Sequence, residues 1–369
     1  MSRIGVGVIG ASPLRPGWAV AAHLPALASL PQYELRAVAT SSERSAVAAA
    51  EAYGVPASAA PIELIARPDV DLVVVTVKLA DHHQLVSDAL AAGKMVMCEW
   101  PLGVDLRQTR DLVDRAQAAK APNLIGLQAS MAPSVRFARA LVTQGYVGDV
   151  LATKMVGSGI AWTSVSDSSH AYMFDAESNA TLLSVPTMHA LDALQFVLGD
   201  VADVRAVGAT RRPVVTLADT KQQIRPTAAD HVAIAATLES GAVASIFYRG
   251  GVSRADNFRW EINGSEGDLV LTSPVGNLQV LAPALLGGRG SDAGVAPLTI
   301  PAAYDLAPGA PEGPPANVAR LYAAFAADVG GHGGGPIAPD FGHALRLHRT
   351  LDRVSRAMSD VTGAAADRS

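Results

Sequence analysis

The chain has 369 residues, of which 49% are hydrophobic and 17% are charged, and its formal net charge is −5. This composition supplies enough apolar side chains for a large core and excludes a wholly disordered chain, and the acidic balance excludes the basic surface that nucleic-acid binding requires. At about 100–200 residues per domain, the length predicts two domains or one large one. The single cysteine, Cys98, excludes an internal disulfide and a cysteine-based zinc site.

The N-terminal segment lacks the pattern of a targeting or membrane segment. Its apolar run is short and breaks at Pro13 and Pro16, whereas a signal peptide has a longer apolar region and a membrane span needs about 20 apolar residues. We therefore expect a cytoplasmic protein that does not associate with membranes. In that reducing compartment Cys98 is expected to be a core residue.

The first third of the chain alternates between strand-like and helical patterns. Short β-branched runs typical of buried strands occur at Ile4–Ile9, Leu35–Ala39, Asp71–Val77, Met95–Cys98 and Leu124–Leu127. Helical patterns lie between them at Trp18–Leu30, Ser42–Tyr53, Asp81–Ala92 and Leu106–Ala119. Strands that alternate with helices of about 10–15 residues are typical of a parallel sheet covered by helices. The alternation predicts a doubly wound α/β domain over residues 1–128.

After Pro133 the alternation becomes β-like. One predicted hairpin covers Asp230–Arg249 with a turn at Ser240–Gly241, and another joins Phe258–Asn263 to Asp268–Thr272. Helical patterns interrupt these strands at Val135–Gln144 and Thr181–Leu198. The pattern predicts an α+β domain over residues 129–315, with a mainly antiparallel sheet and a helix on one face.

The C-terminal region is predicted to be a loop followed by helices. Residues 283–316 are rich in glycine, proline and alanine and are expected to form a loop. Two helical patterns follow, at Asn317–Val329 and Pro339–Met358. We expect residues 316–369 to form C-terminal helices and a tail that pack back onto the rest of the chain.

The junction after the first predicted strand has the position of a dinucleotide-binding loop. Gly10 supplies the tight turn, but Ser12 stands where a second glycine is usual, and the third glycine is displaced to Gly17. The position between a strand and a helix favours cofactor binding by this loop, whereas its spacing allows an ordinary connection. The residues predicted to bind the cofactor here are Gly10, Ala11, Ser12, Gly17 and Trp18.

The end of the second predicted strand bears on which dinucleotide is bound. An NAD site usually has Asp or Glu at this point to hold the ribose hydroxyls, but the chain has Thr40, Ser41 and Ser42, followed closely by Arg44. Hydroxyl groups and an arginine suit a 2′-phosphate, so Thr40, Ser41 and Arg44 favour NADP over NAD. The alternative is that the hydroxyl residues cap the next helix, and the two roles are compatible.

Three motifs together resemble one protein family. They are Ala92-Gly93-Lys94-Met95-Val96-Met97-Cys98-Glu99-Trp100-Pro101, Gly145-Tyr146-Val147-Gly148-Asp149 and His189-Ala190-Leu191-Asp192. The combination is similar to the glucose-fructose oxidoreductase/inositol dehydrogenase (Gfo/Idh/MocA) family over about residues 4–272. The resemblance implies a Rossmann domain, a second domain with an open-faced antiparallel sheet, NAD(P) at the carboxyl ends of the strands and sugar or polyol oxidoreduction. It also implies a homodimer or homotetramer formed through that sheet.

The resemblance also implies further cofactor contacts and shows departures from the family pattern. The matching positions are Val77, His82, Glu99, Trp100, Pro101 and Gln128. The family has Glu-Lys-Pro, with a lysine that helps to move the substrate's hydroxyl proton, where this chain has Glu99-Trp100-Pro101. Val185 replaces an Asp that is usual four residues before His189. The Glu-Trp pair, the long glycine loop and Leu127-Gln128 resemble a narrower group, that of the yeast galactose-pathway repressor, a regulator that binds the dinucleotide.

Few groups remain to carry acid–base chemistry. His189 has an ordinary pKa near neutrality, and Asp192, one helical turn later, is placed to orient it or to bond the backbone or an arginine. The alternative for His189 is to cap the helix that follows it. The chain has five lysines, and Lys78, ahead of Lys154, is the candidate to replace the missing amine. Trp100 is expected to form an apolar wall or to stack on a ligand, the alternative being to fill space beside the first glycine loop.

The predicted function is NAD(P)-dependent oxidoreduction of a sugar, polyol or related hydroxy compound. Trp162 and Tyr172 are expected to line the substrate side together with His189, the alternative being that the two aromatic residues belong to the core. The alternative function is a catalytically silent dinucleotide sensor, which responds to a sugar-like effector and binds a partner protein. No metal site is predicted, because His343 and His348 lack the spacing of a zinc pair.

Overall fold

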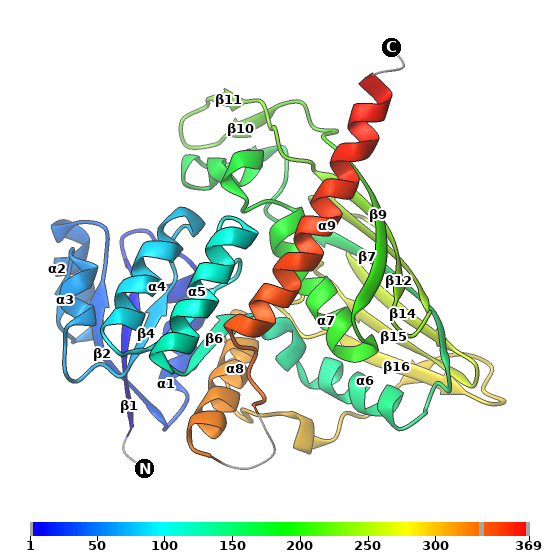
Figure 1. The fold of residues 1–369 in the computed structure, drawn as a ribbon, viewed down its shortest axis with the longest axis horizontal. Helices are drawn as coiled ribbons and strands as arrows, with labels where there is room; N and C mark the ends of the chain where they lie inside the picture. Colours follow the sequence, from blue (N-terminus) through cyan, green and yellow to red (C-terminus); the bar gives the residue numbers. More distant parts are fainter. Residues whose placement is uncertain (1–2, 332–335, 367–369) are drawn as a thin grey trace. The chain divides into compact units, whose positions relative to one another are not determined.

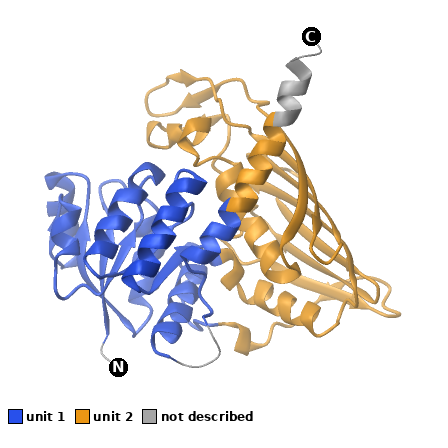
Figure 2. Cartoon of the chain, in the orientation of Figure 1, with its two compact units in different colours: residues 1–128, 306–348 blue, residues 129–305, 349–369 orange. Residues whose placement is uncertain are grey.

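The computed structural model describes residues 3–331 and 336–366, with side chains up to residue 359. The chain forms two compact units (Figure 2). Unit 1 comprises residues 1–128 and 306–348, and unit 2 comprises residues 129–305 and 349–369. Each unit therefore contains segments that are far apart in the sequence. Among the described residues, no helix is both long and apolar enough to cross a membrane.

Unit 1 is built on a parallel sheet whose strand order is β3-β2-β1-β4-β5-β6. This is the doubly wound order of dinucleotide-binding folds, in which ligands bind at the carboxyl ends of the strands. The sheet confirms the predicted Rossmann-type α/β domain. Its strands are β1 (Ile4–Ile9), β2 (Tyr33–Ala39), β3 (Ala57–Ser58), β4 (Leu72–Val75), β5 (Met95–Glu99) and β6 (Asn123–Gly126). Leu72, Val73, Val74 and Val75 are fully buried, as expected for a strand covered on both faces.

The helices of unit 1 begin and end where local chemistry allows. Ser42 caps α2 by accepting a hydrogen bond from the Ser45 backbone, and the helix ends at Gly54 in the left-handed region. Asp105 caps α5 in the same way by accepting from the Gln108 backbone at 2.7 Å. The α-helices of this part of the chain are α1 (Leu24–Ala28), α2 (Glu43–Tyr53), α3 (Pro61–Ile65), α4 (His82–Ala91) and α5 (Leu106–Ala119).

The predicted helix over Trp18–Leu30 is present as two consecutive helical segments. The structure has a π-helical turn at Ala19–His23, followed by the short helix α1. Pro25 lies in the first turn of α1, where its missing N–H costs no helical hydrogen bond. A sequence pattern of period 3.6 does not separate these two forms, because both place apolar residues on one face.

A C-terminal segment completes unit 1. It contains α8 (Pro314–Val329) and the beginning of α9 (Phe341–Ala366). The Ile125 backbone N–H donates to the Pro339 carbonyl at 2.9 Å, and the Phe341 N–H donates to Asn123 Oδ1 at 2.8 Å. These bonds extend the edge of the parallel sheet with residues from the other end of the chain.

Unit 2 is built on a large mixed sheet, with strand order β17-β16-β15-β14-β7-β13-β12-β9. All neighbouring strands are antiparallel except β7 and β13, so the predicted mainly antiparallel domain is confirmed. The helices α6 (Pro133–Thr143) and α7 (Met188–Leu198) lie on one face (Figure 1). The strands are β7 (Val150–Gly159), β9 (Val201–Ala209), β12 (His231–Leu238), β13 (Val243–Gly250), β14 (Phe258–Gly264), β15 (Gly267–Ser273), β16 (Ala284–Arg289) and β17 (Ala296–Pro297).

Both predicted hairpins are present, with β12 paired to β13 and β14 paired to β15. The alternation of β12 also holds, since Val232, Ile234, Ala236 and Leu238 are all buried. On β14 the buried Trp260 donates from Nε1 to the Thr153 hydroxyl on β7 at 2.8 Å. A smaller sheet contains β8 (Val165–Ser166), β10 (Val215–Leu217) and β11 (Gln223–Ile224).

One expectation for this unit is wrong, and one helix has an irregular first turn. Residues 283–316 are not a loop throughout, because they contain β16 and β17. Gly287 is a strand residue paired with Leu269, and a Cβ there would lie 2.8 Å from Leu298 Cδ1. The predicted helix over Thr181–Leu198 is confirmed over residues 183–198, where a π-helical turn at Leu183–Thr187 continues into α7 and contains Pro186. A proline has no N–H for an α-helical bond.

Candidate functional site

The turn after β1 brings the backbone of unit 1 into close contact at its carboxyl edge. Gly10 has a φ of +105°, and a Cβ there would lie 2.5 Å from the Thr76 carbonyl oxygen after β4. The Thr76 hydroxyl donates to the Ile9 carbonyl at 2.7 Å. Only glycine fits at position 10, and the turn lies between β1 and β4, where the strand order reverses. A dinucleotide pyrophosphate approaches the backbone at this point of such folds.

The rest of the glycine loop is open. Ser12 is half-buried, Ala11 is buried and Gly17 is exposed. A Cβ at Gly17 would meet no atom within 4 Å, so packing does not require this glycine. Trp18 follows it, and its indole Nε1 is buried without a hydrogen-bond partner among the described residues.

His82 links the ends of β4 and β5. Its ring nitrogens lie 2.9 Å from the Pro101 carbonyl and 3.1 Å from the Val77 carbonyl. Burial lowers the pKa of His82, so the ring is neutral and donates to one of these carbonyls at a time. The peptide bond between Trp100 and Pro101 is cis. His82 therefore positions the two loops, and its direct contact with a cofactor stays a prediction.

Glu99, at the end of β5, is held by two residues that sequence reasoning missed. His23 Nε2 lies 2.9 Å from Glu99 Oε1, and His23 Nδ1 lies 2.7 Å from the Tyr322 hydroxyl. A carboxylate only accepts hydrogen bonds, so Nε2 carries the proton in the neutral ring and Nδ1 accepts from the tyrosine. Burial raises the pKa of Tyr322, which keeps its proton for this bond. No sequence spacing connects these three positions.

Trp100 is buried rather than presented at an open surface. Its side chain is 4% exposed, and its ring centroid lies 4.5 Å from that of His348 on α9. Burial lowers the pKa of His348 to about 4, so the imidazole is neutral at physiological pH. The neighbour that packs on Trp100 is thus a helix residue more than 200 positions away. Its role as an apolar wall for a ligand stays a prediction.

The side-chain amide of Gln128 bears on whether the carboxyl edge of the sheet in unit 1 fits a cofactor. The residue is 1% exposed, and in the described part of the chain neither Oε1 nor Nε2 of its amide has a hydrogen-bond partner. Leaving a buried amide unpaired costs about 1–3 kcal/mol, and a ligand carrying both donors and acceptors removes that cost. The carboxamide of a nicotinamide has such groups. Together with Gly10 and the unpaired Trp18 indole, Gln128 fits a dinucleotide.

The groups at the end of β2 cap the next helix. The Thr40 hydroxyl is buried, accepts from the Ser45 hydroxyl at 2.9 Å and donates to the Ser42 carbonyl at 3.2 Å. Ser42 is the cap of α2, so the capping alternative holds for these hydroxyls. Ser41 and Arg44 are exposed beside the same helix start, where anions bind well.

In unit 2, His189 lies in the first turn of α7 and is 2% exposed. Burial lowers its pKa to about 3, so the ring is neutral over the physiological range. Its Nδ1 has no partner among the residues whose side chains are described. Asp192 is also buried, one turn along the helix. Val185, at the position of the family's Asp, belongs to the π-helical turn before α7.

The predicted substrate aromatics differ in exposure. Trp162 is 3% exposed, and its Nε1 donates to the Met173 carbonyl at 3.1 Å. Tyr172 is half-buried, and burial raises the pKa of its hydroxyl. The burial of Trp162 is what the core alternative predicts, and a substrate contact stays a prediction for both residues.

The lysine candidates lie in different settings. Lys78 is exposed just after β4, at the carboxyl edge of unit 1. Lys154 lies on β7 of unit 2 and pairs with Glu261 at 3.1 Å. Cys98 is fully buried, and burial raises the pKa of its thiol well above the usual range. The described residues include no cluster of His, Cys, Asp or Glu able to hold a metal ion.

Comparison with known proteins defines the class of this protein. Residues 4–126 match the model of the oxidoreductase family with an NAD-binding Rossmann fold (Gfo/Idh/MocA), and residues 133–273 match the C-terminal domain of Gal80p. The chain therefore combines an N-terminal domain of the Gfo/Idh/MocA oxidoreductase family with a C-terminal domain like that of Gal80p. The predicted resemblance is confirmed.

Particular relatives include both enzymes and regulators. Dehydrogenase aclE of Aspergillus oryzae is 29% identical over 77% of this chain and 81% of its own. A super-repressor mutant of Gal80p from Saccharomyces cerevisiae has the same fold, with a TM-score of 0.86, 21% identity and 97% of each chain covered. Levoglucosan dehydrogenase, in complex with NADH and levoglucosan, also shares it, with a TM-score of 0.83, 21% identity and coverage of 97% and 98%.

Proposed function

We propose that this protein is a nicotinamide-dinucleotide-dependent oxidoreductase acting on a hydroxyl group of a sugar, polyol or related compound. The observation that carries the proposal is the carboxyl edge of unit 1. There a glycine turn fits only glycine, a buried glutamine amide has no partner among the described residues, and Glu99 is fixed by His23. The dinucleotide-dependent relatives of the family support the same assignment.

Different residues along the sheet are proposed to hold different parts of the dinucleotide. Gly10, Ala11, Ser12, Gly17 and Trp18 would hold the pyrophosphate side. Glu99 and Gln128 would hold the nicotinamide side, with Val77, His82, Trp100 and Pro101 shaping it. When bound, the cofactor would supply hydride acceptance and donation. We further propose a preference for NADP, because Ser41 and Arg44 are exposed beside the start of α2 and β2 ends without a carboxylate.

His189 is proposed as the group that moves the substrate's hydroxyl proton. Its imidazole is neutral, as a base requires, and with a pKa of about 3 it is a weak base in the oxidation of an alcohol. Asp192, buried one helical turn along α7, is proposed to orient His189. Lys78 is the proposed second source of a proton. A missing acid–base group lowers a rate by about 10²–10⁴-fold, so slow turnover is expected.

The test measures binding and turnover separately. NADPH and NADH affinities are measured by fluorescence titration, and hydride transfer is followed across a panel of sugars and polyols. We expect dinucleotide binding together with slow turnover on at least one substrate, which His189→Gln abolishes while dinucleotide affinity stays the same. Absence of dinucleotide binding at millimolar concentrations would contradict the proposal.

A second candidate function is a catalytically silent dinucleotide sensor that binds a partner protein. Trp100 stands at the family's lysine position and is packed on His348, and Val185 stands at the position of the aspartate. The match of residues 133–273 to the Gal80p C-terminal domain supports this candidate. Tight dinucleotide binding without turnover on any substrate of the panel would favour it over the enzyme.

We also propose a homodimer or homotetramer formed through the large sheet of unit 2. Val207 on β9 and Val243 on β13 are 51% and 57% exposed, a burial pattern that a partner surface would explain. Light scattering coupled to gel filtration tests this proposal. We expect an oligomer that Val243→Arg converts to monomers, whereas a monomeric native chain would contradict it.

A further inference from the structure

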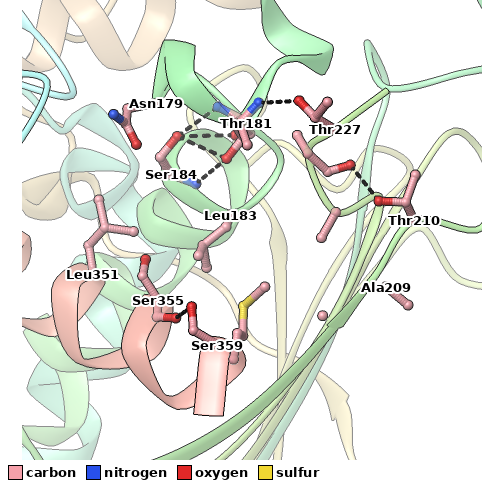
Figure 3. Close-up of a pocket in the computed structure, with 15 residues that line it drawn as sticks. Asn179, Thr181, Leu183, Ser184, Ala209, Thr210, Thr227, Leu351, Ser355 and Ser359 are labelled. Atoms are coloured by element: carbon pink, nitrogen blue, oxygen red, sulfur yellow. Dashed lines mark hydrogen bonds between the residues drawn. The ribbon is translucent and has the colours of Figure 1, made fainter. Parts of the chain in front are cut away.

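Unit 2 contains a cavity of about 580 Å³ that is separate from the residues proposed for catalysis. Three parts of the unit form its walls: the turn before α7, the end of β9 with the segment 227–229, and α9 (Figure 3). The volume lies in the range of about 300–1,000 Å³ that is typical of small-molecule pockets. Its lining residues are Ala176, Asn179, Thr181, Leu183, Ser184, Gly208, Ala209, Thr210, Thr227, Ala228, Ala229, Leu351, Ser355, Met358 and Ser359.

The walls of this cavity are polar without being charged. None of the described residues that line it is Asp, Glu, Lys, Arg or His. Seven of them carry a hydroxyl or an amide, and they come from all three walls: Asn179, Thr181, Ser184, Thr210, Thr227, Ser355 and Ser359. A charged ligand would lose water here without gaining a counter-charge, whereas an uncharged ligand with hydroxyl groups would replace its water by hydrogen bonds.

Two of the threonine hydroxyls have fixed directions. Thr210 Oγ1 donates to the Ala228 carbonyl at 3.0 Å, which leaves the hydroxyl oxygen as an acceptor. Thr227 Oγ1 accepts from the Ala176 backbone at 2.9 Å and lies 3.0 Å from Asp175 Oδ1, to which it donates. Polar groups that are oriented before a ligand arrives lose little conformational entropy when it binds.

The cavity also has an apolar part. Leu183, Leu351 and Met358 contribute aliphatic and thioether surface. Gly208 on β9 makes room for Met358, because a Cβ at Gly208 would lie 2.0 Å from Met358 Cε. Hydroxyl donors and acceptors beside aliphatic surface match a carbohydrate ring, which has hydroxyl groups around its rim and C–H bonds on its faces.

We propose that this cavity binds an uncharged polyhydroxylated molecule of monosaccharide or disaccharide size. Asn179, Thr181 and Thr210 bind its hydroxyl groups, and Leu183 and Leu351 contact its C–H faces. The site lies entirely within unit 2 and does not require a dinucleotide. It is therefore an effector or accessory site whose existence is independent of the proposed oxidoreductase activity.

The test combines calorimetry with hydrogen–deuterium exchange on the full chain, with and without NADPH. The probes are D-glucose, D-galactose, myo-inositol and maltose, with gluconate and glucosamine as charged counterparts. We expect millimolar binding of at least one neutral probe, at least tenfold weaker binding of the charged ones and slower exchange in residues 176–184 and 227–229. The affinity is expected to be the same without NADPH.

Matched variants on α9 locate the binding site. Ser355 is exposed and lines the cavity, so Ser355→Phe fills it and is expected to weaken binding at least tenfold, whereas Ser355→Ala keeps the volume and changes affinity less. Arg356→Phe places the same bulk one position away, outside the cavity lining, and is expected to leave binding unchanged. No binding at tens of millimolar, equal binding of charged probes, insensitivity to Ser355→Phe or a strict requirement for NADPH would each overturn the proposal.

Discussion

His23 and Glu99 are bonded to each other in unit 1, with 2.9 Å between Nε2 and Oε1 across 76 positions of sequence. Tyr322 completes the arrangement from α8, 2.7 Å from the other ring nitrogen. Tyr33 fixes the same helix, because its hydroxyl donates to the Tyr322 carbonyl at 2.7 Å. The carboxylate at the end of β5 is therefore oriented by residues from both ends of the chain.

Removing the Tyr322 hydroxyl tests this arrangement. Tyr322→Phe leaves His23 Nδ1 buried without its partner, so we expect the free energy of unfolding to fall by about 1–3 kcal/mol. Glu99 is then less well oriented, and dinucleotide affinity is expected to fall as well. Tyr248→Phe is the control, since Tyr248 is equally buried and its hydroxyl donates to the Gly276 carbonyl in unit 2 at 3.0 Å. Equal affinities of the two variants, measured by fluorescence titration beside urea unfolding, would contradict the role of Tyr322.

Gly10→Ala tests the turn after β1. The added Cβ meets a backbone carbonyl at 2.5 Å in a left-handed conformation, so we expect a loss of about 2–4 kcal/mol in unfolding free energy. Gly54→Ala has the same left-handed backbone, but no atom lies within 4 Å of its Cβ, so about 1 kcal/mol is expected there. Urea unfolding measures both, and similar losses would show that the contact with Thr76 is unimportant.

The buried histidines predict that stability falls in acid. Burial lowers the pKa of His189 to about 3 and that of His348 to about 4, below the unfolded value of about 6.5. At a pH between the folded and the unfolded pKa of each histidine, that histidine is protonated in the unfolded chain but not in the folded chain. Stability is therefore present above pH 6.5 and falls with decreasing pH, by about 1.4 kcal/mol per pH unit for each such histidine.

Single substitutions separate the contribution of His189 from other titrating groups. His189→Gln is expected to reduce the loss of unfolding free energy between pH 6.5 and pH 5. His170→Gln is the control, because His170 is exposed and pairs with Asp167 at 2.8 Å, whose pKa of about 2 keeps it ionised over this range. Urea unfolding at the two pH values measures the difference. An unchanged slope in His189→Gln would mean that His189 is protonated in the folded chain.

Trp100→Lys introduces the residue that the family has at this position. The change removes the indole from the His348 ring and buries an ammonium group, so we expect a loss on the order of 3 kcal/mol. Trp100→Phe keeps an aromatic ring on His348 and is expected to cost less than half as much. If thermal unfolding shows equal costs for the two variants, the packing of Trp100 on α9 contributes little to stability.

Arg44→Gln tests the preference for NADP. Removing a guanidinium from a 2′-phosphate is expected to weaken NADPH binding by about tenfold and to leave NADH binding unchanged, because only NADPH carries that phosphate. Arg107→Gln is the control, since Arg107 is also exposed but lies on α5. Equal weakening of NADPH and NADH by Arg44→Gln would point to a general role of this arginine rather than to phosphate recognition.

The sequence by itself determined the two kinds of architecture, a sheet of alternating strands and helices followed by a mainly antiparallel sheet. Strands Ile4–Ile9 and Leu72–Val75 are covered on both faces, so their sequences are continuous apolar runs. Strand His231–Leu238 is covered on one face, so buried and exposed residues alternate along it. Both patterns are local and can be recognised from the sequence. The prediction of a loop over residues 283–316 is wrong, because these glycine-rich residues contain two strands. Gly287 resembles a loop residue in sequence but is a strand residue, because β16 pairs with β15.

The tertiary structure decided which residues meet. Gly10, Glu99 and Gln128 could be assigned to the carboxyl edge of the sheet from their order after predicted strands, but the partners of Glu99 and Trp100 could not. Tyr322 and His348 take part because residues 306–348 belong to the same unit as residues 1–128, and His23 comes from the turn before α1. Such contacts leave no periodic signal, since hydrogen bonding and ring packing depend on distance in space and not on separation along the chain.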